Sequence, residues 1–133
     1  MTTPLCRWLA VVALGLMPVW AAAHHSVAEF DLEHPITLHA TVKEVWFSNP
    51  HIRYYVTVVN DNGAEETWDV HGSSVTSLAR RGWTKNTIKV GDKIQINGSP
   101  NRNGIKRVLI RSIVLPSGKT LGSQIEPSER AAQ

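Results

Sequence analysis

The most constraining feature of the sequence is a run of alternating apolar and polar residues that changes phase partway along. Between Ile36 and Phe47 the apolar side chains first occupy every even position up to Val42, and then the odd positions from Val45 onward. Successive side chains of a β-strand point to opposite faces, so a shift by one residue indicates a β-bulge that bends the strand. A long first strand that bends in this way predicts a small closed barrel.

The next two alternating runs predict a hairpin. Residues 52–60 and 65–71 alternate in the same way, and Asp61-Asn62-Gly63 between them is a turn sequence in which the glycine takes a positive φ. Pairing Asn60 with Ala64 sets the register. Apolar residues then face apolar residues and polar residues face polar ones, at the pairs Val56–Trp68, Tyr54–Val70, Tyr55–Asp69 and Arg53–His71.

A short helix is expected after the third strand. Ser73 or Ser74 provides its N-cap, an apolar stripe follows, and Gly82 ends it. Two further strands are expected at residues 93–97 and 106–115. Three strands, a helix and two strands are the order of the OB-fold. The sequence therefore predicts an all-β protein, a five-stranded OB-fold-like barrel with one short helix between strands three and four. An SH3-like barrel or a β-meander is the alternative, but neither requires the helix.

The first 23 residues are expected to be a signal peptide. Arg7 is the only charged residue before Glu29, residues 8–20 carry no charge, and three alanines follow at residues 21–23. This is the pattern of a secretory signal with a small-residue cleavage site, and the apolar core is shorter than the roughly 20 residues that span a membrane. We expect a periplasmic protein without a membrane anchor after cleavage. Cleavage after Ala22 and cleavage after Ala23 both remain open.

The expected segments are the signal peptide (1–23), an N-terminal arm (24–35), the barrel (36–116) and a flexible tail (117–133). The one cysteine, Cys6, is lost with the signal, so no disulfide stabilises the processed chain. Charge is divided unevenly along that chain. Residues 24–72 carry a net charge of −6 and all six histidines, whereas residues 73–133 carry a net charge of +8.

Several short motifs stand in one order along the chain. They are His24-His25-Ser26, Glu29-Phe30-Asp31, Asn49-Pro50-His51, Trp68, Arg80-Arg81-Gly82-Trp83-Thr84 and Val90-Gly91-Asp92. With this combination, roughly residues 23–121 resemble an uncharacterised family of exported bacterial proteins, and the layout is similar to periplasmic bacterial OB-fold proteins in general. The resemblance implies a location and a fold, and it supplies no activity.

The new N-terminus is the first candidate site. If cleavage follows Ala23, the α-amine and Nδ1 of His24 form a chelate that suits Cu(II), and His25, His51 or His71 supplies a further nitrogen. If cleavage follows Ala22, the amine, two amides and the His25 imidazole form a square-planar copper or nickel site. The alternative is a solvated histidine pair ahead of a flexible arm.

The outer face of the second and third strands is the second candidate site. Asp69 beside imidazoles can orient a ligand histidine, or it forms a cross-strand salt bridge with Arg53. The simpler interpretation is that this sheet face is exposed to solvent and binds no ligand. The residues proposed for ligand binding on and beside this face are Trp46, Asn49, Arg53, Tyr55 and Asp69.

Catalysis has little support, because the processed chain has no cysteine nucleophile, no serine elbow, no phosphate loop and no His-Glu-x-x-His. Export also argues against a nucleic-acid partner. We therefore expect a non-enzymatic OB-fold binding protein whose partner is a metal ion, copper first, a small ligand or a periplasmic protein. The alternative to metal binding is a metal-free accessory module that binds a protein partner or a small anionic ligand on the barrel face. A structural protein without a ligand is the third possibility.

Overall fold

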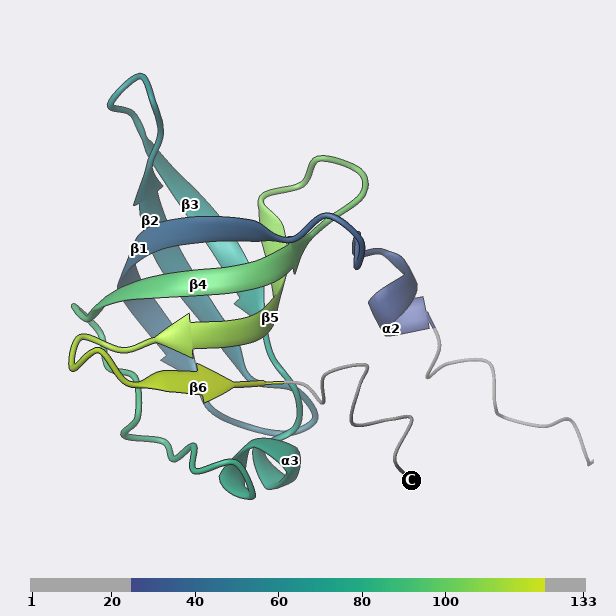
Figure 1. The fold of residues 1–133 in the computed structure, drawn as a ribbon, viewed down its shortest axis with the longest axis vertical. Helices are drawn as coiled ribbons and strands as arrows, with labels where there is room; N and C mark the ends of the chain where they lie inside the picture. The colour runs from purple at the N-terminus through teal and green to yellow at the C-terminus, as the bar shows by residue number, and fades with distance from the viewer. Residues whose placement is uncertain (1–24, 124–133) are drawn as a thin grey trace, which may run out of the picture.

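A computed structural model gives the fold of residues 25–123 (Figure 1). The expected signal peptide, His24 and residues 124–133 lie outside the described residues. The elements are, in chain order, α2 (His25–Ala28), β1 (Ile36–Trp46), β2 (Arg53–Val59), β3 (Glu65–His71), α3 (Val75–Ala79), β4 (Lys93–Pro100), β5 (Arg107–Val114) and β6 (Thr120–Gly122). Within residues 25–123, no helix is long and apolar enough to cross a membrane.

Five strands close into a barrel. The strands lie in the order β3-β2-β1-β4-β5, and β3 pairs with β5 in parallel to complete the ring, while the other neighbours are antiparallel. The short helix α3 connects β3 to β4. This is the predicted all-β, OB-fold-like barrel with its helix between strands three and four.

The predicted bulge in the first strand is confirmed. The pairing of β1 with β2 shifts register between Val42 and Glu44. Residues 36–41 of β1 pair with β4, and residues 40–46 pair with β2. Because the strand bends at the bulge, one strand serves both halves of the barrel, and the apolar side chains stay inside on either side of the bend.

The predicted register of the β2–β3 hairpin is also confirmed. Arg53 pairs with His71, and Tyr55 pairs with Asp69. Gly63 has a φ of 79° in the turn, which an L side chain rarely adopts. The outer face of this hairpin therefore carries the polar side chains that the alternation placed there.

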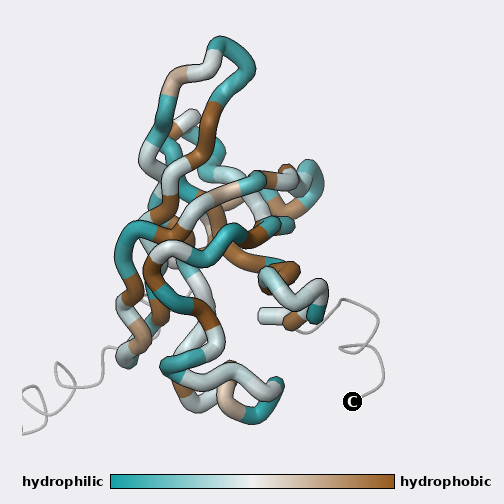
Figure 2. The backbone as a smooth tube through the Cα atoms, turned by 90° about the vertical axis from the view of Figure 1, so that its left-hand side faces the viewer, coloured by the Kyte–Doolittle hydropathy of each residue, from teal (hydrophilic) through white to brown (hydrophobic). Residues whose placement is uncertain are grey.

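The barrel interior is filled by the inward-facing apolar side chains of the strands. Fully buried members include Val42, Ile52, Val56, Val70, Ile96, Val108, Ile110 and Ile113. Ser74 caps α3 by accepting the N–H of Ser77 at 3.2 Å, so that Leu78 of α3 enters the same core. Figure 2 shows hydrophobic residues along the strands and hydrophilic ones at the loops and the hairpin tip.

The folded chain extends past the predicted end of the barrel. Instead of a flexible tail from residue 117, the chain turns at Gly118 and adds β6 to the free side of β5. Leu121 is 5% exposed, and the Trp83 indole donates to the Gly122 carbonyl at 2.9 Å. Alternation in so short a polar segment is too weak to reveal a strand. Its stabilising partner, Trp83, lies far away in sequence.

Gly98 lies at a register shift in the β4–β5 pairing, where the two strands approach closely. A Cβ there would lie 2.5 Å from Cγ2 of Val108 and 2.6 Å from the Leu109 carbonyl oxygen. We expect Gly98→Ala to lower the free energy of unfolding by about 2 kcal/mol, because backbone must move to relieve the overlap. Urea denaturation measures the change. The matched control is Gly122→Ala, whose Cβ would meet no atom within 4 Å and should change stability by less than about 0.5 kcal/mol. Equal effects of the two variants would contradict this account of the bulge.

Candidate functional site

The N-terminal arm is part of the folded structure. Phe30 is 2% exposed and forms a bridge with Asn101, in the loop between β4 and β5. The amide of Asp31 donates to the Pro100 carbonyl at 2.8 Å, and the amide of Arg102 donates to the Glu29 carbonyl at 2.8 Å. Figure 1 shows α2 beside the end of the barrel where β4 leads into β5. The arm therefore holds the start of the described chain against this end of the barrel.

Beneath the arm, one carboxylate is shared by three side chains from three strands. The Asp69 carboxylate accepts two hydrogen bonds from Arg53, Nη2 to Oδ2 at 2.6 Å and Nε to Oδ1 at 3.2 Å. The Nε of Arg107 donates to Oδ2 at 3.1 Å. The Nε2 of His71 lies 3.0 Å from the same oxygen, though off the line of a well-aligned hydrogen bond. We call these four residues together with Glu29 the Asp69 cluster.

Glu29 joins the arm to this cluster. Its Oε2 accepts a hydrogen bond from Arg107 Nη1 at 3.3 Å and another from Asn101 Nδ2 at 3.0 Å. The rings of Phe30 and His71 lie with their centroids 6.2 Å apart, tilted by 54°, which is an ordinary aromatic contact. The arm thus touches the cluster through one charged and one aromatic side chain.

The strand order explains why these residues meet. Arg53 and His71 are a cross-strand pair on the outer face of the β2–β3 hairpin, and Asp69 is next to His71 on that face. The parallel pairing of β3 with β5 places Arg107 directly opposite Asp69. The cluster therefore lies on the outside of the seam that closes the barrel.

The electrostatics of the cluster favour an ionised Asp69. Burial raises the pKa of this carboxyl, whose side chain is 14% exposed. The hydrogen bonds from Arg53, followed by the interaction with His71, lower the pKa by more than burial raises it. The pKa of Asp69 therefore lies below its ordinary value of 3.8. In turn the hydrogen bond to Asp69 raises the pKa of the Arg53 guanidinium. At neutral pH two carboxylates, Asp69 and Glu29, therefore face two guanidiniums, Arg53 and Arg107.

The structure brings together three of the residues proposed from sequence, Arg53, Asp69 and His71. Tyr55 joins them, because its ring lies 5.3 Å from the guanidinium carbon of Arg53. His51 is exposed just before β2, where the neighbouring Ile52 amide donates to the Ser73 carbonyl at 3.1 Å. His51 therefore lies beside the end of β3 that carries His71.

The remaining candidates lie elsewhere or outside the described residues. Trp46 is 53% exposed, and its indole donates to Glu44 Oε1 at 2.7 Å. Asn49 has a structural partner, since its Oδ1 accepts the Val75 amide at the start of α3 at 3.1 Å. His25 begins α2, and His24 precedes the first described residue.

The described side chains do not make a metal site by themselves. Among residues 25–123 no group of three or more His, Cys, Asp or Glu side chains is arranged to hold a metal ion. A metal bound near the Asp69 cluster would therefore need ligands from outside residues 25–123.

A separate open groove of about 710 Å³ crosses the outer face of the barrel. Outward side chains of β1, β2 and β4 line it, among them His39, Thr41, Thr57 and Gln95. The groove includes no residue of the Asp69 cluster and none of the proposed site residues.

Alternation alone did not reveal the roles of Glu29, Phe30 and Arg107. Arg107 is one of many basic residues in its half of the chain, and the sequence does not distinguish it from the others. Only the parallel pairing of β3 with β5 identifies Asp69 as its partner. The one signal for the other two was the Glu29-Phe30-Asp31 motif in a segment that otherwise reads as an irregular arm.

The fold and this site define a class of protein, a small OB-fold barrel whose N-terminal arm docks on a charged network over the barrel seam. The family model for a family of unknown function (DUF6152) matches residues 11–110, and the chain belongs to that family. No curated protein and no solved structure matches the chain.

Replacing Asp69 by asparagine should lower the free energy of unfolding at pH 7 by about 2 kcal/mol, because two partly exposed guanidiniums lose a charged partner. The folded pKa of Asp69 is depressed, so its stabilisation is present above the ordinary carboxyl pKa of 3.8 and is lost as pH falls through the folded value. The difference between wild type and Asp69→Asn should therefore shrink below about pH 4. Denaturation at several pH values measures it.

The control for this experiment is Asp61→Asn in the exposed hairpin turn. Asp61 forms no ion pair with any other described residue, so this variant should change stability by less than about 0.5 kcal/mol. A difference between wild type and Asp69→Asn that is small at neutral pH, or that grows on acidification, would contradict the proposed network.

Proposed function

We propose that the chain is an exported, non-catalytic binding protein whose processed N-terminus binds a divalent transition metal, copper first, beside the Asp69 cluster. In this proposal the signal peptide is removed after Ala23, and the α-amine and Nδ1 of His24 chelate the ion. The observation that carries the proposal is the docking of the arm next to His71 by Glu29 and Phe30.

The length of the arm supports His71 as a further ligand. The chain from His24 to Phe30 spans at most about 20 Å even when fully extended, and the four-residue helix α2 shortens it. Since the ring of Phe30 lies 6.2 Å from the ring of His71, this length limits how far the N-terminal chelate can lie from that imidazole. Such tethering raises the effective concentration of one ligand at the other.

The position of Asp69 also favours this role for His71. Asp69 Oδ2 lies 3.0 Å from Nε2 of His71 without a well-aligned hydrogen bond. If the ring aligns with this carboxylate on metal binding, the proton is held on Nε2 and the Nδ1 lone pair is left for the metal. Ligating histidines commonly have such a carboxylate partner. His51, on the adjacent end of β2, is the alternative imidazole.

The second candidate function is a metal-free accessory module that binds a protein partner or a small anionic ligand on the barrel face. The observation in its favour is the exposed Trp46, at 53%. The internal pairing of Arg53 and Arg107 with Asp69 makes that face a weaker site for an anion, because a ligand would have to compete with an existing carboxylate. We therefore rank it second.

Copper titration of the processed protein by isothermal calorimetry tests the proposal, after mass spectrometry has identified its first residue. If that residue is His24, we expect a dissociation constant below about 1 μM, which corresponds to more than about 8 kcal/mol of binding free energy. Affinity should rise with pH, because the amine and imidazole must lose protons to bind. If the first residue is Ala23, the same test applies with His25 as the key imidazole.

Three single variants locate the site. His24→Ala should weaken copper binding by about a hundredfold or more, and His71→Ala by about tenfold, since each removes a ligand. His39→Ala is the matched control, because His39 lies in the separate groove, and it should leave the affinity unchanged. Micromolar or weaker binding that His24→Ala does not alter would refute metal binding at the N-terminus.

A further inference from the structure

The segment between Asp69 and Asp92 contains no acidic residue. It includes α3 and the loop that leads to β4, and its charged side chains are Arg80, Arg81, Lys85 and Lys89. Residues 93–125 also lack acidic residues, so Asp92 is the one acidic residue between Asp69 and Glu126. Arg53 and Arg107, by contrast, are neutralised by an ion pair with Asp69.

Tertiary structure leaves this charge uncompensated within the part of the chain that is described. The ion pairs there involve Arg53, His71, Lys106, Arg107 and His34, and none involves the four cations of the α3 segment. Arg80, Lys85 and Lys89 are also exposed to solvent. We call the surface formed by Arg80, Arg81, Lys85, Lys89 and Lys119 the basic end.

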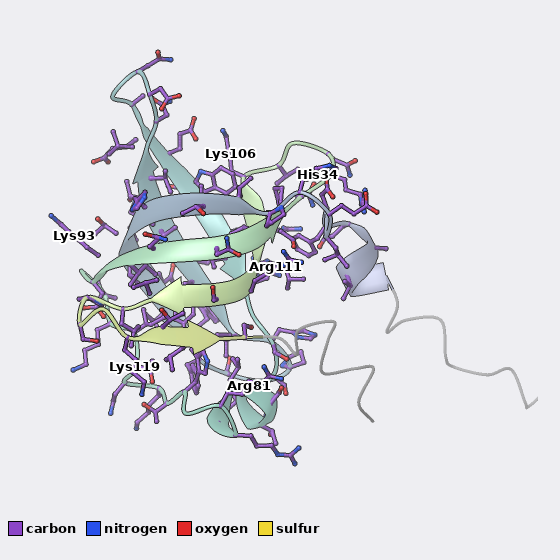
Figure 3. The ribbon with its side chains drawn as sticks, in the orientation of Figure 1. His34, Arg81, Lys93, Lys106, Arg111 and Lys119 are labelled. Carbon is purple, nitrogen blue, oxygen red and sulfur yellow. The ribbon has the colours of Figure 1, made fainter. Side chains whose placement is uncertain are left out.

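The basic end lies at one extreme of the molecule. Figure 1 shows α3 at the opposite end from the tip of the β2–β3 hairpin, which carries Asp61, Glu65 and Glu66. Figure 3 shows Arg81 and Lys119 toward the α3 end, while Lys106, paired with Glu66 at 2.9 Å, lies toward the other. The protein is therefore electrically polar along its length, and an extended anionic surface would orient it with α3 inward.

The shape and chemistry of the basic end fit lipid headgroups better than nucleic acid. Trp83, the aromatic residue of the segment, is 1% exposed and cannot stack on a base. The groove described above does not include Arg80, Arg81, Lys85 or Lys89, and three of these cations, Arg80, Lys85 and Lys89, are exposed at the surface. Val90 is 66% exposed next to Lys89, which provides an apolar side chain at the level of the headgroups.

We propose that the basic end docks the protein onto membranes rich in anionic phospholipid. The interaction is peripheral and electrostatic, with the β2–β3 hairpin directed away from the bilayer. Each basic residue near an anionic lipid surface strengthens partitioning by about fivefold, and salt weakens the effect. This surface is separate from the Asp69 cluster, so the proposal does not depend on metal binding.

Vesicle sedimentation of the processed protein tests the docking surface. The probes are vesicles of phosphatidylcholine alone and of equal parts phosphatidylcholine and phosphatidylglycerol. We expect binding to the anionic vesicles only, and its loss between about 0.1 M and about 0.5 M salt as the Debye length falls. The variant Lys85→Gln/Lys89→Gln should reduce the partition coefficient by more than about tenfold.

The control variant removes the same net charge at the opposite end. Arg102→Gln/Lys106→Gln should lower the partition coefficient by less than about threefold, because both residues lie away from α3. Lys106 lies toward the β2–β3 hairpin (Figure 3), and Arg102 lies in the β4–β5 loop that binds the arm (Figure 1). Circular dichroism confirms that both variants are folded. Equal losses in the two variants, or absence of binding to anionic vesicles, overturn the proposal. Binding to polyglutamate without binding to vesicles also overturns it, in favour of an acidic protein partner.

Discussion

The parallel pairing of β3 with β5 is the contact on which the rest of the structure depends. It closes the barrel, and it brings Asp69 and Arg107 opposite each other on the outer surface. This pair joins segments 38 residues apart, and among the described strands only the antiparallel β1–β4 pair joins segments farther apart in sequence. Closure by such a non-local pair is costly in chain entropy. The hydrogen bonds that converge on Asp69 help to stabilise it, because they join β2, β3 and β5 at one carboxylate.

The same seam gives the N-terminal arm its place. Glu29 shares Arg107 with Asp69, and Phe30 packs against His71, so an otherwise polar segment becomes a layer over the closed barrel. In the proposed function, the docked arm limits how far the N-terminal ligands can lie from His71. The metal proposal rests on this arrangement. The membrane proposal rests on the other end of the molecule, where cations have no partner within residues 25–123. The two ends could act independently.

Much of the fold was predictable from local pattern. The phase change between Val42 and Val45 located the bulge, and the alternation on either side of Gly63 set the hairpin register. Interactions between distant segments were not predictable in this way. Gly122, next to the buried Leu121, accepts a hydrogen bond from Trp83, 39 residues away, and Glu29 accepts one from an arginine 78 residues away. Of the proposed site residues, Arg53, Asp69 and His71 shared a strand face and met as a result, whereas Asn49 caps α3 through a contact between loops.

Hydrogen exchange of two backbone amides tests most directly whether the arm belongs to the folded unit. The amide of Asp31 donates to Pro100, and the amide of Arg102 donates to Glu29, so both bonds exist only while the arm is docked. We predict that both amides are protected nearly as strongly as those in the centre of β2, and that Phe30→Ala removes their protection while β2 stays protected. Exchange of both amides in the wild-type protein at the rate of an unstructured peptide would contradict the account.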